Sequence, residues 1–389
     1  MEVKQIYDLM NSVTGEILGE TEHPLAEDLS NVVDVGTEIL NASSVDNYVR
    51  SLVNHIGRVI FVNRPYYGGV PSVLRDGWEF GSVLQKITAE LPTASENESW
   101  ELEDGASYDC NIFYKPEVSA KFFNKRVTFE IPRSFTEKQV KESFSNAEQL
   151  NGFLSMLYNA VDKSMTIKID SLIMRTINTM IGETLYSEYG ADAYASKSGV
   201  KAINLLYLYN QRYGLTGADA LTADKALTTP EFIRFASYEM GVISSRLTKI
   251  SRVFNIGGKD RFTARDMLHV VMLTDFVKSA NVFLQSDVFH NDLTALPNAD
   301  EIPYWQASGS TYAFGDISKI NITTPSNHVV ECGGILGVMF DHDALGVANL
   351  DRRVTTFYNP KGEFFNNYYK FDAGYFCDTN ENFVVFFIA

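Results

Sequence analysis

Few residues of this sequence have the types and spacing that catalysis or metal binding needs. Asp341, His342 and Asp343 form the one compact group of carboxylates and imidazole, which are side chains that can bind a divalent ion. Adjacent residues of a β-strand point to opposite faces, so these three could converge on one ion only through a turn. We therefore interpret the group as a turn between two strands and expect no metal site there.

Other segments match catalytic motifs only in part. The serines of residues 307–312 lack the flanking glycines of a hydrolase nucleophile. Residues 257–260 do not have the spacing of a phosphate-binding loop, and the glycines of residues 333–337 precede a predicted strand instead of following one. His269 lies in an apolar pattern of helical spacing, which favours a histidine of the core. We therefore expect neither an enzyme nor a bound cofactor.

The composition is that of an ordinary soluble protein, with 389 residues of which 45% are hydrophobic and 21% charged. No apolar run approaches the ~18 residues of a membrane helix, and we expect no secretory signal and no membrane contact. Cys110, Cys332 and Cys377 are far apart and are expected to be reduced. The net charge of −16, of which −9 falls in residues 1–49, argues against a direct grip on nucleic acid.

The element that organises the rest of the chain is a long predicted helix at about residues 147–187. Apolar residues recur there every three or four positions, and no proline interrupts the pattern, which predicts a helix of roughly 60 Å. An ordinary core helix and a spine that spans a thin, flat subunit both agree with this pattern. The recurring residues are Leu150, Leu154, Leu157, Val161, Met165, Ile169, Leu172, Ile173, Ile177, Met180 and Ile181.

The N-terminal region is acidic and has few residues that could anchor a core. We expect an arm that lies on another surface, with short helices at residues 3–18 and 44–62; a disordered tail is the alternative for the first 30 residues.

Residues 78–126 predict a long pair of strands joined by a polar, acidic connection that is too long for a hairpin turn. An isolated two-stranded ribbon is barely stable in water, so a neighbouring molecule is expected to support it. Acidic and basic residues of this region could then meet across an interface, whereas a solvated hairpin within a larger sheet is the alternative. The candidate contact residues here are Glu98, Glu101, Glu103, Asp104, Lys121, Lys125 and Arg126.

Residues 191–349 mix predicted helices and strands. Thr229 and Pro230 have the positions of an N-cap and of the first residue of a helix. Thr263 with Asp266 predicts a second helix start, opening a helix at residues 267–283. Residues 335–348 predict a buried strand, a turn and a second apolar run.

The last fifty residues carry a resemblance. They contain a basic turn and an aromatic run, with Arg352, Arg353, Asn359, Pro360, Gly362, Asn366, Tyr368, Asp372 and Ala373 at the matching positions. This segment resembles the C-terminal end of tailed-bacteriophage major capsid proteins, the family named after the Hong Kong 97 capsid fold. The order of the upstream elements agrees with the same family.

The resemblance implies an α+β fold whose parts are named as in that family. They are an N-terminal arm (1–77), an E-loop (78–126), a P-domain with the spine helix (127–190), an A-domain (191–349) and returning P-domain strands (350–389). It adds Arg352 and Arg353 to the candidate contacts between subunits. It also raises the question of a Lys to Asn cross-link, for which candidates exist in Lys115, Lys121, Lys125, Asn359, Asn366 and Asn367.

The function implied is that of a major capsid protein, which forms pentamers and hexamers of an icosahedral shell around double-stranded DNA. The implied partners are further copies of the chain, a portal, a possible decoration protein and a separate scaffolding protein, unless assembly needs no scaffold. The implied location is the virion, after assembly in the host bacterial cytoplasm. Excess negative charge is expected to keep packaged DNA from adhering to the shell. A cellular cargo shell of the same fold and an enzyme of unrecognised type are the alternatives.

Overall fold

A computed structural model describes residues 70, 73–75, 84–89, 91–92, 94, 96, 103–106, 110–116, 118–136, 138, 147–190, 194–285, 300–306 and 313–389. The helices expected at residues 3–18 and 44–62 lie outside these ranges. The chain divides into two compact units, each described by itself below. Unit 1 takes its described residues from Met1–Glu79, Arg126–Arg175 and Val347–Gly374, and unit 2 from Phe80–Lys125, Thr176–Gly346 and Tyr375–Ala389.

The predicted long helix is confirmed as α5, Ala147–Tyr189, whose 43 residues correspond to about 65 Å. Its residues up to Arg175 belong to unit 1 and the others to unit 2. Gly190 follows it with a φ of +65°, and the Gly190 N–H donates to the carbonyl of Tyr186 at 2.8 Å. A glycine accepts this left-handed conformation without strain, so the helix ends there. The expected apolar positions from Val161 to Ile181 are buried, whereas the positions from Leu150 to Leu157 lie outside the described side chains.

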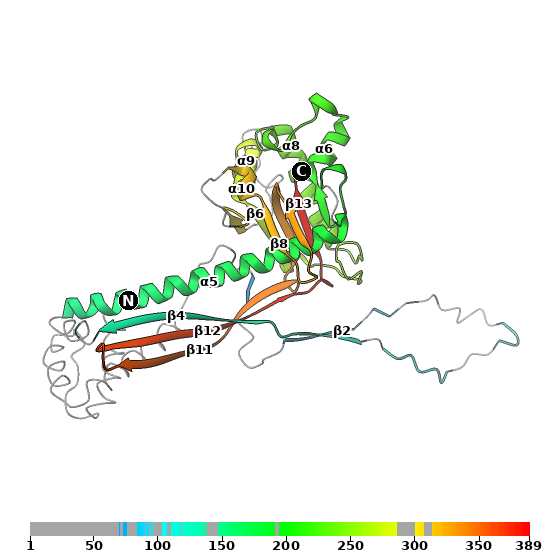
Figure 1. Cartoon of the computed structure of the whole chain (residues 1–389). Coiled ribbons are helices and arrows are strands. Elements are labelled where there is room, and N and C mark those ends of the chain that lie inside the picture. Colours follow the sequence, from blue (N-terminus) through cyan, green and yellow to red (C-terminus); the bar gives the residue numbers. More distant parts are fainter. Residues whose placement is uncertain are drawn as a thin grey trace. The chain divides into compact units, whose positions relative to one another are not determined.

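Unit 1 contains a four-stranded sheet in the order β1-β11-β12-β4, and α5 runs along it (Figure 1). β12 pairs antiparallel with β4 without interruption from Phe364↔Thr136 to Gly374↔Arg126. Along β12 buried and partly exposed residues alternate, as expected for a strand with one face on a core. The strands are β1 (Leu74–Arg75), β4 (Arg126–Thr136), β11 (Leu345–Asn359) and β12 (Phe364–Cys377), of which Leu345–Gly346 and Tyr375–Cys377 belong to unit 2.

The turn between β11 and β12 explains the motif around Asn359. The Asn359 side-chain oxygen accepts hydrogen bonds from the backbone N–H groups of Lys361 and Gly362 at 3.0 and 3.2 Å. An asparagine can stabilise a tight turn in this way, and Pro360 fixes the backbone that follows it. Turn formation therefore gives a local reason for Asn359 and Pro360 in this sequence.

Unit 2 is built on a five-stranded sheet in the order β5-β13-β10-β6-β7. The central strand β10 pairs antiparallel with β13 and with β6, while β13 with β5 and β6 with β7 are parallel. Every residue of β10 and β13 is buried. The strands are β5 (Ala202–Asn204), β6 (Leu268–Leu273), β7 (Asp300–Ile302), β10 (Ile335–Asp341) and β13 (Phe383–Phe387).

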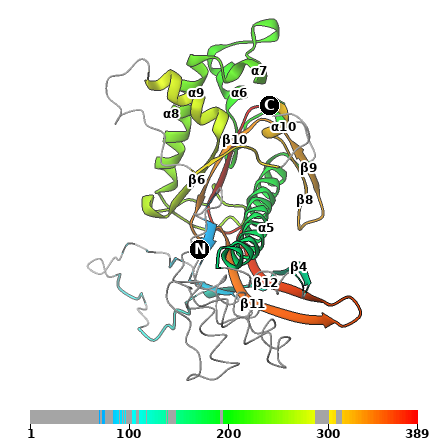
Figure 2. The same cartoon turned by 90° about the vertical axis from the view of Figure 1, so that its left-hand side faces the viewer.

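Helices cover one face of this sheet, as Figure 2 shows for α8 and α9 beside β6 and β10. Phe232 and Met240 of α8 and Phe276 of α9 join Met339 and Phe386 of the sheet in one buried cluster. Asn204 caps α6 by accepting from the Tyr207 N–H at 3.0 Å. The helices are α6 (Leu205–Tyr213), α7 (Ala223–Ala226), α8 (Pro230–Leu247), α9 (Thr274–Gln285) and α10 (Phe314–Ile317).

The last turns of α5 contribute to the core of unit 2. The ring of Tyr189 meets that of Phe387 on β13 edge to face at 5.7 Å, and the side chain of Asn178 donates to the carbonyl of Trp305 at 2.7 Å. Two small antiparallel ribbons complete the unit. They are β2 (Leu84–Ala89) with β3 (Val118–Phe123), and β8 (Ile320–Thr323) with β9 (Val329–Cys332).

The structure corrects two local predictions. The helix expected at residues 267–283 is the strand β6 followed by α9, so His269 lies on a strand. Thr263 is buried and accepts from the side chain of Asn382 at 3.2 Å instead of capping a helix. Thr229 does precede α8, but its hydroxyl donates to the carbonyl of Lys225 and makes no cap hydrogen bond. The α+β class is confirmed, as are the buried strand and the turn within residues 335–348, where the second apolar run is the beginning of β11.

Candidate functional site

The β2–β3 ribbon has two chemically different faces. Its register places Lys86 opposite Lys121 and Thr88 opposite Ser119, and the hydroxyls of this second pair lie 2.9 Å apart. Because side chains alternate along a strand, these residues share one face, and Ile87 lies on the other. One face of the ribbon therefore carries two ammonium groups and two hydroxyl groups.

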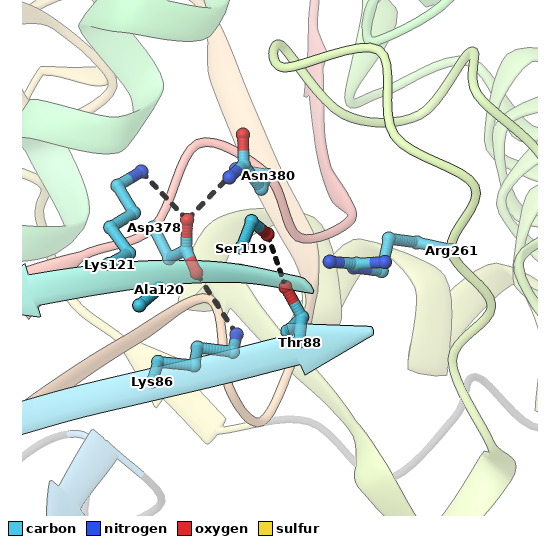
Figure 3. Close-up of a pocket in the computed structure, with 8 residues that line it drawn as sticks. All are labelled: Lys86, Thr88, Ser119, Ala120, Lys121, Arg261, Asp378 and Asn380. Atoms are coloured by element: carbon cyan, nitrogen blue, oxygen red, sulfur yellow. Dashed lines mark hydrogen bonds and ion pairs between the residues drawn. The ribbon is translucent and has the colours of Figure 1, made fainter. Parts of the chain in front are cut away.

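The two lysines are held by carboxylates of the segment after β12. Lys86 Nζ lies 3.0 Å from Asp378 Oδ2 and 2.6 Å from Glu381 Oε1, and Lys121 Nζ lies 2.9 Å from Asp378 Oδ1. Arg261 Nε donates to the same Glu381 oxygen at 3.1 Å. Figure 3 shows both lysines pointing from their strands to Asp378. We call these five residues the anchor cluster, and all of them belong to unit 2.

Local hydrogen bonds fix the carboxylate of Asp378. The Asp378 N–H donates to the carbonyl of Ala344 at 2.6 Å, and Asp378 Oδ1 accepts from the Asn380 N–H at 3.1 Å. Burial raises the pKa of Asp378, but the hydrogen bond from Lys121 and the charge of Lys86 outweigh burial, and the pKa is lowered overall. The side chain is 2% exposed and remains charged because it is paired on both oxygens.

The anchor cluster borders a pocket of about 140 Å³. Charged and polar side chains of the lining include Lys86, Lys121, Arg261, Asp378 and Asn380, as Figure 3 shows. Both lysines of the lining are engaged with the carboxylate of Asp378 at hydrogen-bond distance. Charge-assisted hydrogen bonds of this kind contribute about 1.5–3 kcal/mol each. We conclude that the chemistry of this site is that of an attachment point, which fixes the ribbon to the body of unit 2.

The opposite face of the ribbon is apolar and exposed. Ile87, Val118 and Phe122 lie on it and are 63%, 59% and 61% exposed. Along the connection between the strands, Phe113 and Tyr114 are more than 80% exposed. This is the reverse of the usual arrangement, in which a ribbon turns its apolar face to the body and its charges to water. Contiguous exposed apolar side chains indicate a binding surface.

The candidate contact residues are placed as follows. Glu98 and Glu101 lie outside the described residues. Glu103 and Asp104 are exposed in the connection, and Lys125 is exposed between β3 and β4. Of the nine candidates only Lys121 belongs to the anchor cluster, where its partner is Asp378 of the same chain.

The three candidate arginines lie on the sheet of unit 1. Arg126 begins β4, and Arg352 and Arg353 lie on β11. Arg353 pairs with Asp372 across to β12 at 2.9 Å. Burial raises the pKa of Asp372, but the hydrogen bonds from Arg353 and Thr128 outweigh burial, and the pKa is lowered overall.

Sequence reasoning missed the other four members of the anchor cluster. Asp378 is 257 positions from Lys121 and 292 from Lys86, so no local spacing could reveal the contact. The one available signal is the alternation of Lys86 with Ile87 in a predicted strand. It shows that the charge and the apolar side chain lie on opposite faces, but not which face meets the body.

The segment considered for metal binding is a turn. The Asp343 N–H donates to Asp341 Oδ1 at 2.8 Å, and the rings of His269 and His342 share a hydrogen bond of 2.8 Å. Within the described ranges, no group of three metal-binding side chains is found. The same ranges contain no helix long and apolar enough to cross a membrane. Cys110, Cys332 and Cys377 are free thiols in the structure.

Comparison with known proteins finds a matching family and a related phage protein. The family described as Phi29-like phage major capsid protein matches residues 10–387. A major capsid protein of Bacillus phage GA-1 is 19% identical over 168 residues, which are 42% of this chain and 34% of that protein. The match therefore spans about a third of the relative's length.

Solved structures are also similar to this chain. A chain of the capsid structure of Staphylococcus phage Andhra is 8% identical with a TM-score of 0.49, covering 84% of this chain and 86% of that one. A chain from the structure of the head fiber and inner core protein of native bacteriophage P68 is 7% identical with a TM-score of 0.48, covering 85% and 86%.

Proposed function

Since this chain belongs to the family of Phi29-like phage major capsid proteins, we propose that it assembles with copies of itself into a closed shell. Its α+β fold is of the Hong Kong 97 type. The shell is icosahedral, is built from pentamers and hexamers, and encloses the double-stranded DNA of a tailed bacteriophage. A capsid protein is a component of the virion, and assembly takes place in the host bacterial cytoplasm. The chain acts as a building block and catalyses no reaction.

One observation supports this proposal above the others, namely the reversed ribbon β2–β3. Its charged face is fixed to unit 2 by the anchor cluster, and its apolar face is exposed. Burying a Phe or Ile side chain stabilises by roughly 1.5–3 kcal/mol each, so leaving Ile87 and Phe122 in water is unfavourable for a solitary subunit. A neighbouring copy that covers this face recovers that free energy on assembly.

The predicted parts and contacts belong to the same proposal. We take residues 1–77 as an arm, 78–126 as the E-loop, 127–190 and 350–389 as the P-domain and 191–349 as the A-domain. The contacts between subunits are made by the candidates outside the anchor cluster, which are Glu98, Glu101, Glu103, Asp104, Lys125, Arg126, Arg352 and Arg353. Lys121 has a different role, because it holds the ribbon in its own subunit.

Further partners are proposed from the family alone. A separate scaffolding protein, a portal and a decoration protein are the expected ones. The match to a phage family favours packaged DNA over protein cargo as the content of the shell. The net charge of −16 favours repulsion between shell and DNA, so empty shells should not retard DNA at low salt.

The role of the apolar face can be tested by substitution. We expect the pair Ile87→Ser and Phe122→Ser to leave a folded subunit, because both side chains are more than 60% exposed, and to abolish closed shells in electron micrographs. Gln85→Ser is the matched control, since Gln85 lies on the same face and is polar, and it should assemble like the parent. Normal shells from the double variant would contradict this role.

Deletion of residues 93–106 tests the connection between the two strands. The described residues of this segment, 94, 96 and 103–106, are exposed and lie outside the buried cluster of unit 2, so the deleted chain should keep its circular dichroism spectrum and fail to form closed shells. Complete particles in sedimentation of the deleted chain would refute the proposed contact. If the parent chain, with or without an assembly helper, never forms shells, the proposed function itself is refuted.

A further inference from the structure

The segment between α8 and β6 has a charge opposite to that of the whole chain. Residues 246–266, here called the basic loop, hold six basic and two acidic residues, a net charge of +4 in a chain of −16. Four of the basic side chains are exposed, and they are Arg246, Lys249, Arg252 and Arg265. A positive patch on an acidic protein is expected to attract an acidic surface.

The backbone of the basic loop is fixed in place. Ser251 and Arg261 exchange two backbone hydrogen bonds of 2.9 and 3.1 Å, and the side chain of Asn255 bonds the backbone of Lys259 at 2.7 and 2.8 Å. Phe254 is buried, and the Gly257 N–H donates to the carbonyl of Thr379 at 2.9 Å. A loop that is already ordered loses little conformational entropy when it binds a partner.

Apolar side chains are interspersed with the charges of the basic loop. Ile250 and Phe262 are both 56% exposed, and each lies next to one residue of the Ser251↔Arg261 bridge. Beside them Arg252 and Asp260 form an ion pair of 2.6 Å. Exposed arginine together with aromatic and aliphatic side chains is typical of protein interfaces, whereas contacts with a nucleic-acid backbone are dominated by polar groups. The composition favours a protein partner.

The chain itself contains a segment that matches this surface. Residues 96–109, here called the acidic connection, hold six carboxylates and no basic residue, together with Trp100, Leu102 and Tyr108. Of its carboxylates, those of Glu96, Glu103 and Asp104 are described and exposed. We propose that the basic loop of one copy binds the acidic connection of a second copy. This proposal rests on the shell-building function proposed above and names one of its contacts.

Charge reversal with rescue tests the contact. The triple variant Arg246→Glu, Lys249→Glu, Arg265→Glu should stay folded by circular dichroism, because all three side chains are exposed, and should lose closed shells. The reciprocal triple variant Glu96→Lys, Glu103→Lys, Asp104→Lys should lose them too. The six changes combined in one chain should restore shells, because attraction returns with the signs exchanged.

Two results of this experiment would overturn the proposal. One is normal assembly of either triple variant, and the other is failure of the folded chain with all six substitutions to form shells. If the basic-loop variant assembles normally but its subunits lose retardation of DNA at low salt, the loop binds nucleic acid instead. Failure of the parent chain to assemble would refute the shell function as a whole, which separates the two hypotheses.

A cross-link locates the contact directly. Cys110 follows the acidic connection and is exposed, whereas burial raises the pKa of Cys332 and of Cys377 to about 12 and keeps both thiols unreactive. A chain with Cys110→Ser and Ser245→Cys carries its reactive thiol beside Arg246. Mixed with parent chains and treated with a short bismaleimide, it should give covalent dimers in assembled particles.

The matched control replaces Ser245→Cys by Ser187→Cys, a second exposed serine of unit 2 that lies on α5. This control should give no dimer with the parent chain. Assembled particles without the dimer expected for Ser245→Cys would overturn the contact and leave the shell function intact.

Discussion

Replacing Asp378 by asparagine removes one charge from the anchor cluster without changing the size of the side chain. The carboxylate is 2% exposed and accepts from Lys86 at 3.0 Å and from Lys121 at 2.9 Å. Removing one partner of a fully buried ion pair costs 3–5 kcal/mol as an order of magnitude. Here the cost is lower, because Lys86 keeps Glu381 at 2.6 Å and Lys121 is 38% exposed and can be hydrated. We expect a loss of about 2 kcal/mol.

This loss should concern the ribbon and not the whole unit. Among the described strands, β2 and β3 pair only with each other, so their docking can open locally. About 2 kcal/mol corresponds to roughly a 30-fold increase in the open population. Amide hydrogen exchange of residues 84–89 and 118–123 should therefore accelerate by about that factor in Asp378→Asn, while exchange in β10 stays unchanged.

The matched control is Glu301→Gln, which breaks the pair with Lys278 in the same unit. Those side chains are 36% and 61% exposed, and exposed pairs contribute less than about 1 kcal/mol. Unchanged exchange of the ribbon in Asp378→Asn, or equal effects of the two variants, would refute the attachment role of the anchor cluster.

Three further predictions concern the core and the pH dependence. Leu172→Asp should prevent folding, because the side chain is 3% exposed and a buried charge would have no partner, whereas Ile167→Asp on the same helix, 63% exposed, should give soluble native protein in circular dichroism. Gly334→Ala should lower the free energy of unfolding in a urea titration by at least about 2 kcal/mol. The reason is that φ at Gly334 is +72° and the added Cβ would lie 1.8 Å from the carbonyl oxygen of Ile388. In the control Gly333→Ala the added Cβ meets nothing within 4 Å, so the free energy of unfolding should be nearly unchanged. The pKa of Asp378 in the folded state is below its ordinary value of 3.8, so the folded state binds fewer protons than the unfolded state. The contribution of Asp378 to stability is therefore complete above pH 3.8 and is lost as the pH falls through the lowered pKa. Hydrogen exchange of the ribbon should therefore accelerate only in strong acid, and this acid-dependent step should be absent from Asp378→Asn.

The long helix α5 could be predicted because its signal is local and repeated. Apolar residues at helical spacing continue over many turns, and the glycine at position 190 marks the end. The strand β6 was predicted as a helix for the opposite reason. Its residues 268–273 are nearly all apolar and lie in the middle of a sheet, so no alternation separates a buried strand from a buried helix.

The candidate site was predicted only in its outline. A strand pair with an acidic connection follows from composition, and Lys121 was predicted only as a contact residue between subunits. Its partner Asp378 lies 257 positions away, in a turn that forms only when β12 and β13 are in place. Such a contact depends on the tertiary fold, and the spacing of residues along the chain gives no local signal of it.

The position of β13 in the sheet of unit 2 has a consequence for synthesis of the protein. Residues 383–387 insert between β5, whose residues end at Asn204, and β10, which begins at Ile335. Before the ribosome has translated residues 383–387, the growing polypeptide lacks β13, and β5 has no strand to pair with in the sheet of unit 2. Closure then joins partners about 180 positions apart, as in Val385↔Ala202, a step that is slow because of the long intervening chain. Nascent chains of this protein should therefore depend on chaperones until translation has passed this strand.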